Sequence, residues 1–140
     1  MAKLIIAINL TFKEEGLWSD GKGKNANDSG GRTYKGIAEN ANKDWGGWII
    51  INKHLKDKNF PQCLEDIPEL QILTETRYRV KYWNPFWGDK ILNQNTANNL
   101  FDTSVNFGAS VAIKMMQQAV KLKSTGIMDE ITLTKLNDIV

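Results

Sequence analysis

The chain has 140 residues, of which 41% are hydrophobic and 24% are charged, and its formal net charge is +2. This length and composition predict one globular domain with a real core. The small net charge, without a basic cluster, argues against a nucleic-acid binder. No apolar run approaches the ~18 residues of a membrane helix, so we expect no membrane insertion.

Residues 1–10 hold one lysine and a short apolar run without a convincing cleavage site. They therefore predict a mature helix rather than a signal peptide, so action outside the cytoplasm would require release or another export route. The single cysteine, Cys63, excludes an intramolecular disulfide and a Cys-based metal cluster. His54 is the only histidine and has no evident partner, which favours a surface helix residue. Neither a phosphate-loop nor a calcium-loop pattern is present, so we expect no cofactor and no metal.

The first expected element is a helix over residues 3–15, with its apolar residues on one face and a stop at Gly16. Glu15 would then lie at the helix C-terminus. The negative end of the helix dipole disfavours a carboxylate there and should raise its pKa, which suits a general acid. Residues 19–36 are rich in glycine and predict a long loop or a small irregular hairpin.

More helices are expected downstream. Pro68 fits the first turn of a short helix to Leu73, and Thr74 can cap a further helix from Glu75 to about Trp83. Part of 38–59 should also be helical, with Trp45 and Trp48 more often core than surface.

The C-terminal third predicts three helices. Thr96 or a nearby Asn can cap the first, and Gly108 should interrupt the chain before a helix over 109–121. Asp129 can cap the last helix. The residues expected on the buried side of 109–121 are Val111, Met115, Gln118, Ala119 and Leu122. No extended strand alternation is visible, so the fold class is mainly α.

Glu15, Asp28 and Thr33 form a candidate catalytic set. Glycosidic cleavage uses two carboxylates, one to protonate the leaving oxygen and one to activate water or stabilise the transition state. A hydroxyl such as that of Thr33 can position the water. Acidic pairs at this spacing are common and mostly solvated, so the pattern alone leaves the choice open.

Longer motifs sharpen this choice. The segments are Glu15-Gly16-Leu17-Trp18 and Asp28-Ser29-Gly30-Gly31-Arg32-Thr33-Tyr34-Lys35-Gly36-Ile37, followed by Tyr82-Trp83, Leu100–Gly108, and Ala112 with Gln117-Gln118-Ala119. In this order they resemble glycoside hydrolase family 108, a family of phage- and secretion-associated N-acetylmuramidases.

The resemblance implies a lysozyme-like, mainly helical single domain over 1–140. Residues 1–88 would form a muramidase-like part, and 89–140 a helical part similar to the family's peptidoglycan-binding segment. Glu15 would be the catalytic acid and Asp28 the second acidic group, whereas Glu14 matches nothing. The implied function is cleavage between N-acetylmuramic acid and N-acetylglucosamine, in phage lysis or secretion-linked wall remodelling. The implied partners are peptidoglycan strands and a holin or secretion machinery, with action at the cell wall.

Aromatic side chains suit a carbohydrate groove because their faces stack on sugar rings. Trp18 and Tyr34 lie in the polar loop and are expected to line such a groove. Tyr82 and Trp83 could belong to the groove rim or to the core. Asn106 could bind an N-acetyl group or stabilise a helix end.

Two departures from the family pattern motivate an alternative. Leu17 and Trp18 replace a Gly and a Tyr, and the segment 125–132 is a degenerate form of the family's C-terminal motif. The alternative is a non-catalytic peptidoglycan-binding or secretion-apparatus module on the same fold.

Overall fold

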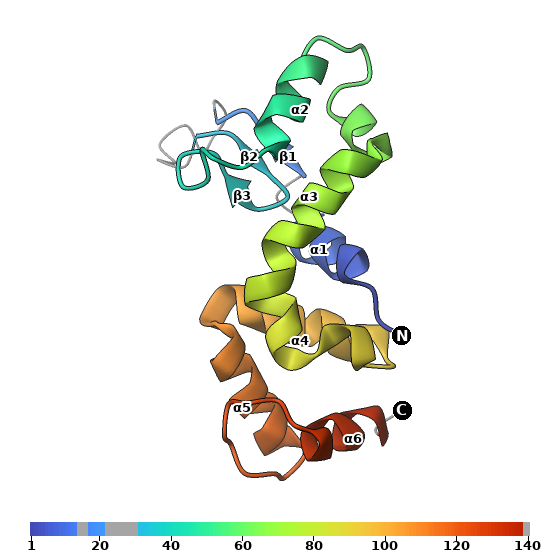
Figure 1. Cartoon of the computed structure of the whole chain (residues 1–140), viewed down its shortest axis with the longest axis vertical. Coiled ribbons are helices and arrows are strands. Elements are labelled where there is room, and N and C mark those ends of the chain that lie inside the picture. Colours follow the sequence, from blue (N-terminus) through green and yellow to red (C-terminus); the bar gives the residue numbers. More distant parts are fainter. Residues whose placement is uncertain (14–16, 22–30, 139–140) are drawn as a thin grey trace. The chain divides into compact units, whose positions relative to one another are not determined.

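The computed structural model describes residues 1–13, 17–21 and 31–138, which are mainly helical, as expected (Figure 1). The chain divides into two compact units. Unit 1 comprises Met1–Thr11 and Thr76–Val140, and unit 2 comprises Phe12–Glu75. The units change over at 11/12 and 75/76. The single-domain assignment and its parts 1–88 and 89–140 stay predictions.

A small antiparallel sheet forms the start of unit 2. Its strands are β1 (Trp18–Ser19), β2 (Thr33–Tyr34) and β3 (Ile37–Ala38), in the order β1-β2-β3. Lys35 and Gly36 join β2 to β3, and both have positive φ, at 45° and 81°. Two positive φ angles characterise the type I′ turn, whose twist matches an antiparallel hairpin. The expected small hairpin is therefore present as a three-stranded sheet.

The helices of unit 2 are α2 (Gly47–His54), the 3₁₀ helix η2 (Gln62–Asp66) and α3 (Pro68–Tyr78), which continues past Glu75 into unit 1. Trp45 and Trp48 are each 5% exposed, which confirms their expected place in the core. Pro68 begins α3 as predicted. Thr74 does not cap a second helix, because its hydroxyl lies inside α3 and donates to the Leu70 carbonyl at 2.8 Å. A threonine can satisfy its hydroxyl in this way without ending a helix.

Unit 1 holds most of α1 (Leu4–Phe12) and the helices α4 (Gln94–Phe107), α5 (Ala109–Ala119) and α6 (Glu130–Asp138). Three short turns connect α3 to α4: the π-helical η3 (Arg79–Trp83) and the 3₁₀ helices η4 (Asn84–Phe86) and η5 (Gly88–Lys90). The core residues of this unit include Leu4, Ile8, Trp83, Phe86, Ile91, Leu100, Phe101, Ala112, Ile113 and Leu136.

Local capping signals set the ends of these helices. The Asn93 side chain accepts from the Thr96 backbone N–H at 3.0 Å, so the asparagine rather than the threonine caps α4. Gly108, with φ of 95°, separates α4 from α5 as expected. Asp129 caps α6 by accepting from the Thr132 backbone N–H at 2.7 Å, which confirms its predicted role.

The buried face of α5 differs from the expected one. Val111 and Met115 are 42% and 52% exposed, whereas Ala112, Ile113 and Gln117 are buried. The Gln117 amide Nε2 donates to the Ile127 carbonyl at 3.1 Å, and its Oε1 accepts from the Gly126 N–H at 3.0 Å. A buried polar side chain needs such partners. The loop with Gly126 and Ile127 supplies them, so the face of α5 that carries Gln117 can be buried. The hydrophobic pattern alone does not contain that information.

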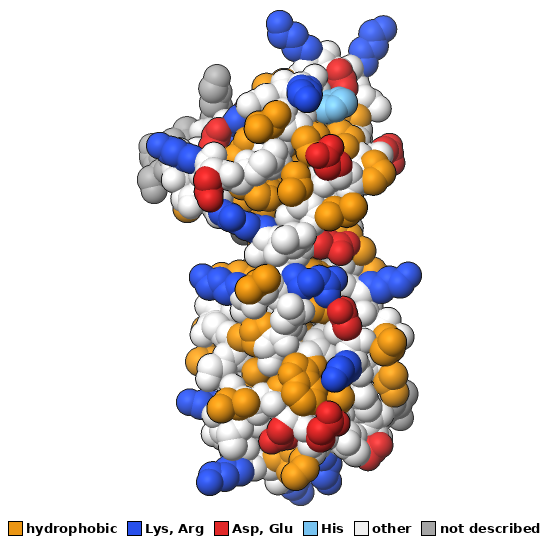
Figure 2. All heavy atoms as spheres, viewed as in Figure 1, with side chains coloured by type: hydrophobic (Ala, Val, Ile, Leu, Met, Phe, Trp, Pro, Cys, Tyr) orange, Lys and Arg blue, Asp and Glu red, His pale blue; other side chains and the backbone are white. Residues whose placement is uncertain are grey.

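The visible surface carries mixed charges. Figure 2 shows Lys and Arg side chains spread over this face with Asp and Glu among them, without a single large basic patch. Among the described helices, none has both the length and the apolar character needed to cross a bilayer.

Candidate active site

The two predicted catalytic carboxylates, Glu15 and Asp28, lie outside the described residues. The described chain resumes at Leu17 and again at Gly31, so the sheet that follows each carboxylate can be examined. The Leu17 carbonyl accepts from the Lys35 N–H at 2.8 Å, which holds the start of β1 beside the turn after β2.

One face of the sheet carries two hydroxyl groups. Ser19 pairs with Thr33 across β1 and β2, and Thr33 pairs with Ala38 across β2 and β3. Directly opposed residues of antiparallel strands share a face, so these three side chains lie together, and all three are half-buried. Thr33 was predicted, but Ser19 was missed. Ser19 stands four residues after Glu15, but this spacing alone does not indicate a functional residue. The strand register is needed to show that Ser19 lies beside Thr33.

The opposite face of the sheet packs inward. Successive residues of a strand point to opposite sides, so Trp18, Tyr34 and Ile37 share the second face. Tyr34 is 1% exposed and its ring stacks on Trp45 with centroids 6.4 Å apart. The expectation that Tyr34 faces a groove is therefore corrected: its aromatic surface is used in core packing. Trp18 stays half-buried, with its ring edge-on to Phe60 at 5.2 Å.

Arg32 holds the chain immediately before Thr33. Its guanidinium makes a bidentate pair with Glu39, at 2.8 and 2.6 Å, and donates to Asn52 Oδ1 at 2.7 Å. It also lies 5.9 Å from the Trp18 ring centre and 5.3 Å from that of Trp48. The hydrogen bonds from Arg32 lower the pKa of the Glu39 carboxyl. Sequence reasoning assigned no role to Arg32, although its place in the motif marked it.

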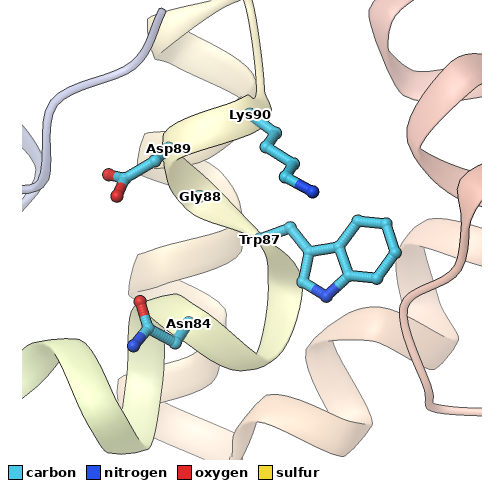
Figure 3. Close-up of a pocket in the computed structure, with 5 residues that line it drawn as sticks. All are labelled: Asn84, Trp87, Gly88, Asp89 and Lys90. Carbon is cyan, nitrogen blue, oxygen red and sulfur yellow. The ribbon is translucent and has the colours of Figure 1, made fainter.

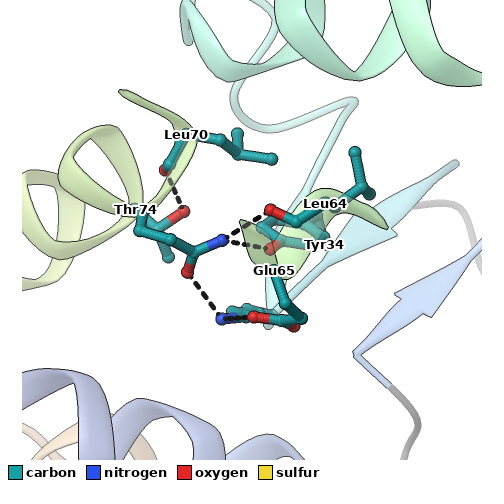
Figure 4. A network of polar contacts seen from close by, with 7 residues as sticks. Tyr34, Leu64, Glu65, Leu70 and Thr74 are labelled. Carbon is teal, nitrogen blue, oxygen red and sulfur yellow. Dashed lines mark hydrogen bonds and ion pairs between the residues drawn. The ribbon is translucent and has the colours of Figure 1, made fainter. Parts of the chain in front are cut away.

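A network of polar contacts that includes Tyr34, Leu64 and Glu65 holds the turn between β2 and β3 (Figure 4). Lys35 is 0% exposed, and its ammonium donates to Glu65 Oε2 at 2.7 Å and to Gln71 Oε1 at 2.8 Å. The Gln71 amide in turn donates to the Tyr34 hydroxyl at 3.1 Å and to the Leu64 carbonyl at 2.9 Å. Burial raises the pKa of Tyr34 above its ordinary value, so this phenol stays protonated. The network ties the sheet to η2 and α3.

Three further predicted contact residues lie in unit 1. Trp83 is 0% exposed and packs edge-on against Phe86 at 5.3 Å, so it belongs to the core rather than to a groove rim. Tyr82 is half-buried. Asn106 is exposed near the end of α4, and its amide donates to the Asp102 carbonyl at 2.9 Å. Of the three, Tyr82 and Asn106 keep surface that a ligand could contact.

Unit 1 also holds a pocket of about 240 Å³, which is lined by Asn84, Trp87, Gly88, Asp89 and Lys90. Figure 3 shows Lys90 and Trp87 on one side of it, and Asn84 and Asp89 on the other. The Lys90 ammonium is 4.8 Å from the centre of the Trp87 ring. The volume is below the ~300–1,000 Å³ of usual ligand pockets, so it fits one small group at most.

Asp89 is already engaged at the edge of that pocket. It accepts from Trp83 Nε1 at 2.9 Å and from Arg79 at 2.8 Å. Burial acts to raise the pKa of Asp89, but these hydrogen bonds outweigh it and the pKa is lowered. Asp89 is therefore an ionised structural group, which does not suit the work of a general acid.

The interpretation of His54 as a residue without a partner is wrong. His54 Nδ1 lies 2.7 Å from Asp57 Oδ2, so the histidine does have a partner. Cys63 lies near both, and the three side chains could together hold a metal ion. The sequence obscured this set because the spacing of the three residues in a polar loop matches no familiar ligand motif.

The chain is similar to known proteins both in sequence and in fold. Residues 8–108 match the model of a family described as glycosyl hydrolase 108. The solved structure of SagA from Brucella abortus is similar, with 24% sequence identity and a TM-score of 0.53. The similarity covers 97% of this chain and 69% of that one, and it supports the fold. A search of curated proteins finds no match.

Proposed function

The chain belongs to the glycosyl hydrolase 108 family, and from that premise we propose that it is an N-acetylmuramidase acting on peptidoglycan. Family membership makes it a glycoside hydrolase in general terms. The finer assignment is cleavage between N-acetylmuramic acid and N-acetylglucosamine. The setting that we propose is phage lysis or secretion-linked remodelling of the wall. The observation that carries the proposal is that the family match spans Glu15, Asp28 and the Thr33 strand.

Glu15 is the proposed general acid. It would protonate the glycosidic oxygen as the bond to the anomeric carbon breaks, while Asp28 stabilises the developing positive charge or activates the water. Retaining enzymes hold their carboxyl groups roughly 5 Å apart and inverting enzymes about 6.5–9.5 Å apart. The stereochemical course therefore depends on the separation of these two groups.

The hydroxyl face of the sheet supports the role proposed for Thr33. Ser19 and Thr33 are direct neighbours across β1 and β2, and both are half-buried. Two adjacent hydroxyls can hold one water between them because each group both donates and accepts. Arg32 and the Lys35 network hold the strand on either side, so this face would be rigid when substrate binds. Trp18, whose half-buried ring lies on the other face of the sheet, is the aromatic that we propose for a separate sugar contact.

The test compares the Glu15→Gln and Glu14→Gln variants on purified peptidoglycan, with release of reducing ends as the readout. Glutamine keeps the shape of the carboxylate but cannot donate the proton of an acid. General acid catalysis contributes about 10²–10⁴ in rate, so Glu15→Gln should lose at least about a hundredfold. Glu14→Gln is the matched control and should stay near wild type. Equal activity of wild type and Glu15→Gln would refute the assignment of the acid.

The same purified peptidoglycan and variants distinguish the muramidase from the alternative, a non-catalytic wall-binding module. It predicts sedimentation with peptidoglycan without new reducing ends, even at stoichiometric protein. The observation that favours it is the degenerate segment 125–132, which lies beyond the family match. Reducing ends released by wild type and not by Glu15→Gln would exclude it.

A further inference from the structure

Three potential metal ligands of different types meet at one end of α2. His54 is the last residue of α2, Asp57 lies in the following loop, and Cys63 lies in η2. Their nearest ligand atoms all lie within 4.8 Å of one another. Imidazole nitrogen, carboxylate oxygen and thiolate sulfur are the three side-chain donors that Zn²⁺ uses in proteins.

We propose that His54, Asp57 and Cys63 bind a zinc ion, with water in the fourth position. Zinc bonds of about 2.0–2.3 Å in a tetrahedron place neighbouring ligand atoms roughly 3.3–3.8 Å apart. In the cluster the ligand atoms lie within 4.8 Å of one another, and His54 Nδ1 and Asp57 Oδ2 are 2.7 Å apart, so binding would replace the hydrogen bond between these two atoms and widen their separation. Binding moves the Cys63 thiol proton to solvent, because the thiolate is the ligand. The ion stays divalent and the site is neutral when Asp57 and Cys63 are both anionic.

Backbone hydrogen bonds hold the ligands near each other before any metal arrives. The Asp57 N–H donates to the His54 carbonyl at 3.0 Å, and the Phe60 N–H donates to the Asp57 carbonyl at 3.1 Å. The Cys63 N–H donates to the Asn59 carbonyl at 3.0 Å. Leu64, the residue after Cys63, is 0% exposed and anchors η2 in the core. A preformed loop lowers the entropic cost of collecting the ligands.

The ligand atoms of the cluster, more than the charges around it, indicate which class of metal it would bind. Lys53, Lys56 and Lys58 are exposed beside the cluster, so long-range charge does not attract a cation. Calcium and magnesium depend on several oxygen ligands, and Asp57 is the only one in this set. A borderline-soft ion that bonds nitrogen and sulfur gains its affinity from short-range ligation instead. This reasoning favours zinc over the hard cations.

The site would brace the loop that supports the proposed groove. Phe60 lies between Asp57 and Cys63, and its ring packs edge-on against Trp18 at 5.2 Å. A metal that joins the end of α2 to η2 would therefore restrict the loop behind Trp18. The metal proposal does not depend on the muramidase proposal, since its test reads the metal directly.

The experiment titrates the purified, untagged 140-residue chain with Co²⁺, a spectroscopic substitute for Zn²⁺. A thiolate–cobalt charge-transfer band and intense visible bands report a tetrahedral site with sulfur. The sequence contains one cysteine and one histidine, so these signals identify their source. We expect one Co²⁺ per chain, displaced by Zn²⁺. His54→Gln and Asp57→Asn should each weaken binding at least about tenfold, and Cys63→Ser should abolish the charge-transfer band.

Asp66→Asn is the matched control, since it removes an exposed carboxylate of the same η2 that is not in the cluster. It should bind Co²⁺ as wild type does. Far-UV circular dichroism checks that every variant is folded. The proposal is overturned if no band develops up to about 1 mM Co²⁺. It is also overturned if His54→Gln binds like wild type, or if sedimentation shows one metal shared by the Cys63 thiolates of two chains.

Discussion

Replacing Glu65 with glutamine should destabilise unit 2 through the buried ammonium of Lys35. Lys35 is fully buried, and its ion pair with Glu65 has an N–O distance of 2.7 Å. Removing one partner of a fully buried pair costs about 3–5 kcal/mol, whereas an exposed pair is worth less than about 1 kcal/mol. The Glu65 side chain is 35% exposed and the substituted glutamine would keep an acceptor oxygen, so the expected loss is intermediate, about 2 kcal/mol.

Two measurements test this value. Urea unfolding followed by far-UV circular dichroism reports the free energy of unfolding, and hydrogen exchange reports local opening. The amide of Lys35 donates to the Leu17 carbonyl, and its exchange should quicken roughly 30-fold, since about 1.36 kcal/mol is a factor of ten. Adding Lys35→Met to Glu65→Gln should recover part of the loss, because no buried charge then remains unpaired.

Asp66→Asn serves as the control, since this exposed neighbour in η2 should change stability by less than about 0.5 kcal/mol. A Glu65→Gln variant whose stability stays within that same limit would refute the reasoning. It would mean that Gln71 and solvent satisfy the ammonium without the carboxylate.

Three other substitutions test separate features. Gly88→Ala should lower the free energy of unfolding by about 1–3 kcal/mol in urea denaturation, because the added Cβ overlaps the fully buried Trp83 ring; wild-type stability would contradict that packing. Gln117→Leu should cost about 2 kcal/mol in the same assay, since the polar groups it binds lose their partner; a neutral result would show that water replaces it. Glu39→Gln should flatten the acid side of the stability–pH curve. The folded-state pKa of Glu39 is lowered by Arg32, so its stabilisation is present above about pH 4.3 and lost as pH falls through the lowered value. The pair is partly exposed and contributes less than about 1 kcal/mol; an unchanged slope on the acid side of about pH 4.3 would contradict the prediction.

Local signals in the sequence determined several of the helix boundaries, although the signal at Thr74 was wrong. Pro68 begins α3, Gly108 separates α4 from α5, and Asp129 caps α6, all as predicted. These signals act within one or two turns of the chain, through hydrogen bonds and backbone angles that a few neighbouring residues specify. The motif around Thr33 can also be recognised without coordinates, because it is defined by residue types at fixed spacing along the chain.

Tertiary structure alone decided which of the marked residues are exposed. Tyr34 and Trp83 lie in the core, whereas Met115 lies at the surface. Burial depends on elements far apart in the sequence, and an aromatic in a polar segment fits a groove and a core equally well by composition. The network of Lys35 joins residues thirty or more positions away, at Glu65 and Gln71.

The same limit applies to the sites. Ser19 meets Thr33 only through the strand register, and His54 meets Cys63 only because the loop between them folds back. Sequence spacing does not predict either contact. In each case the chain must reverse direction, and the entropic cost of closing that loop is offset by packing of the surrounding core. The candidate catalytic residues were thus a property of the sequence. The hydroxyl pair and the proposed zinc ligands are properties of the fold.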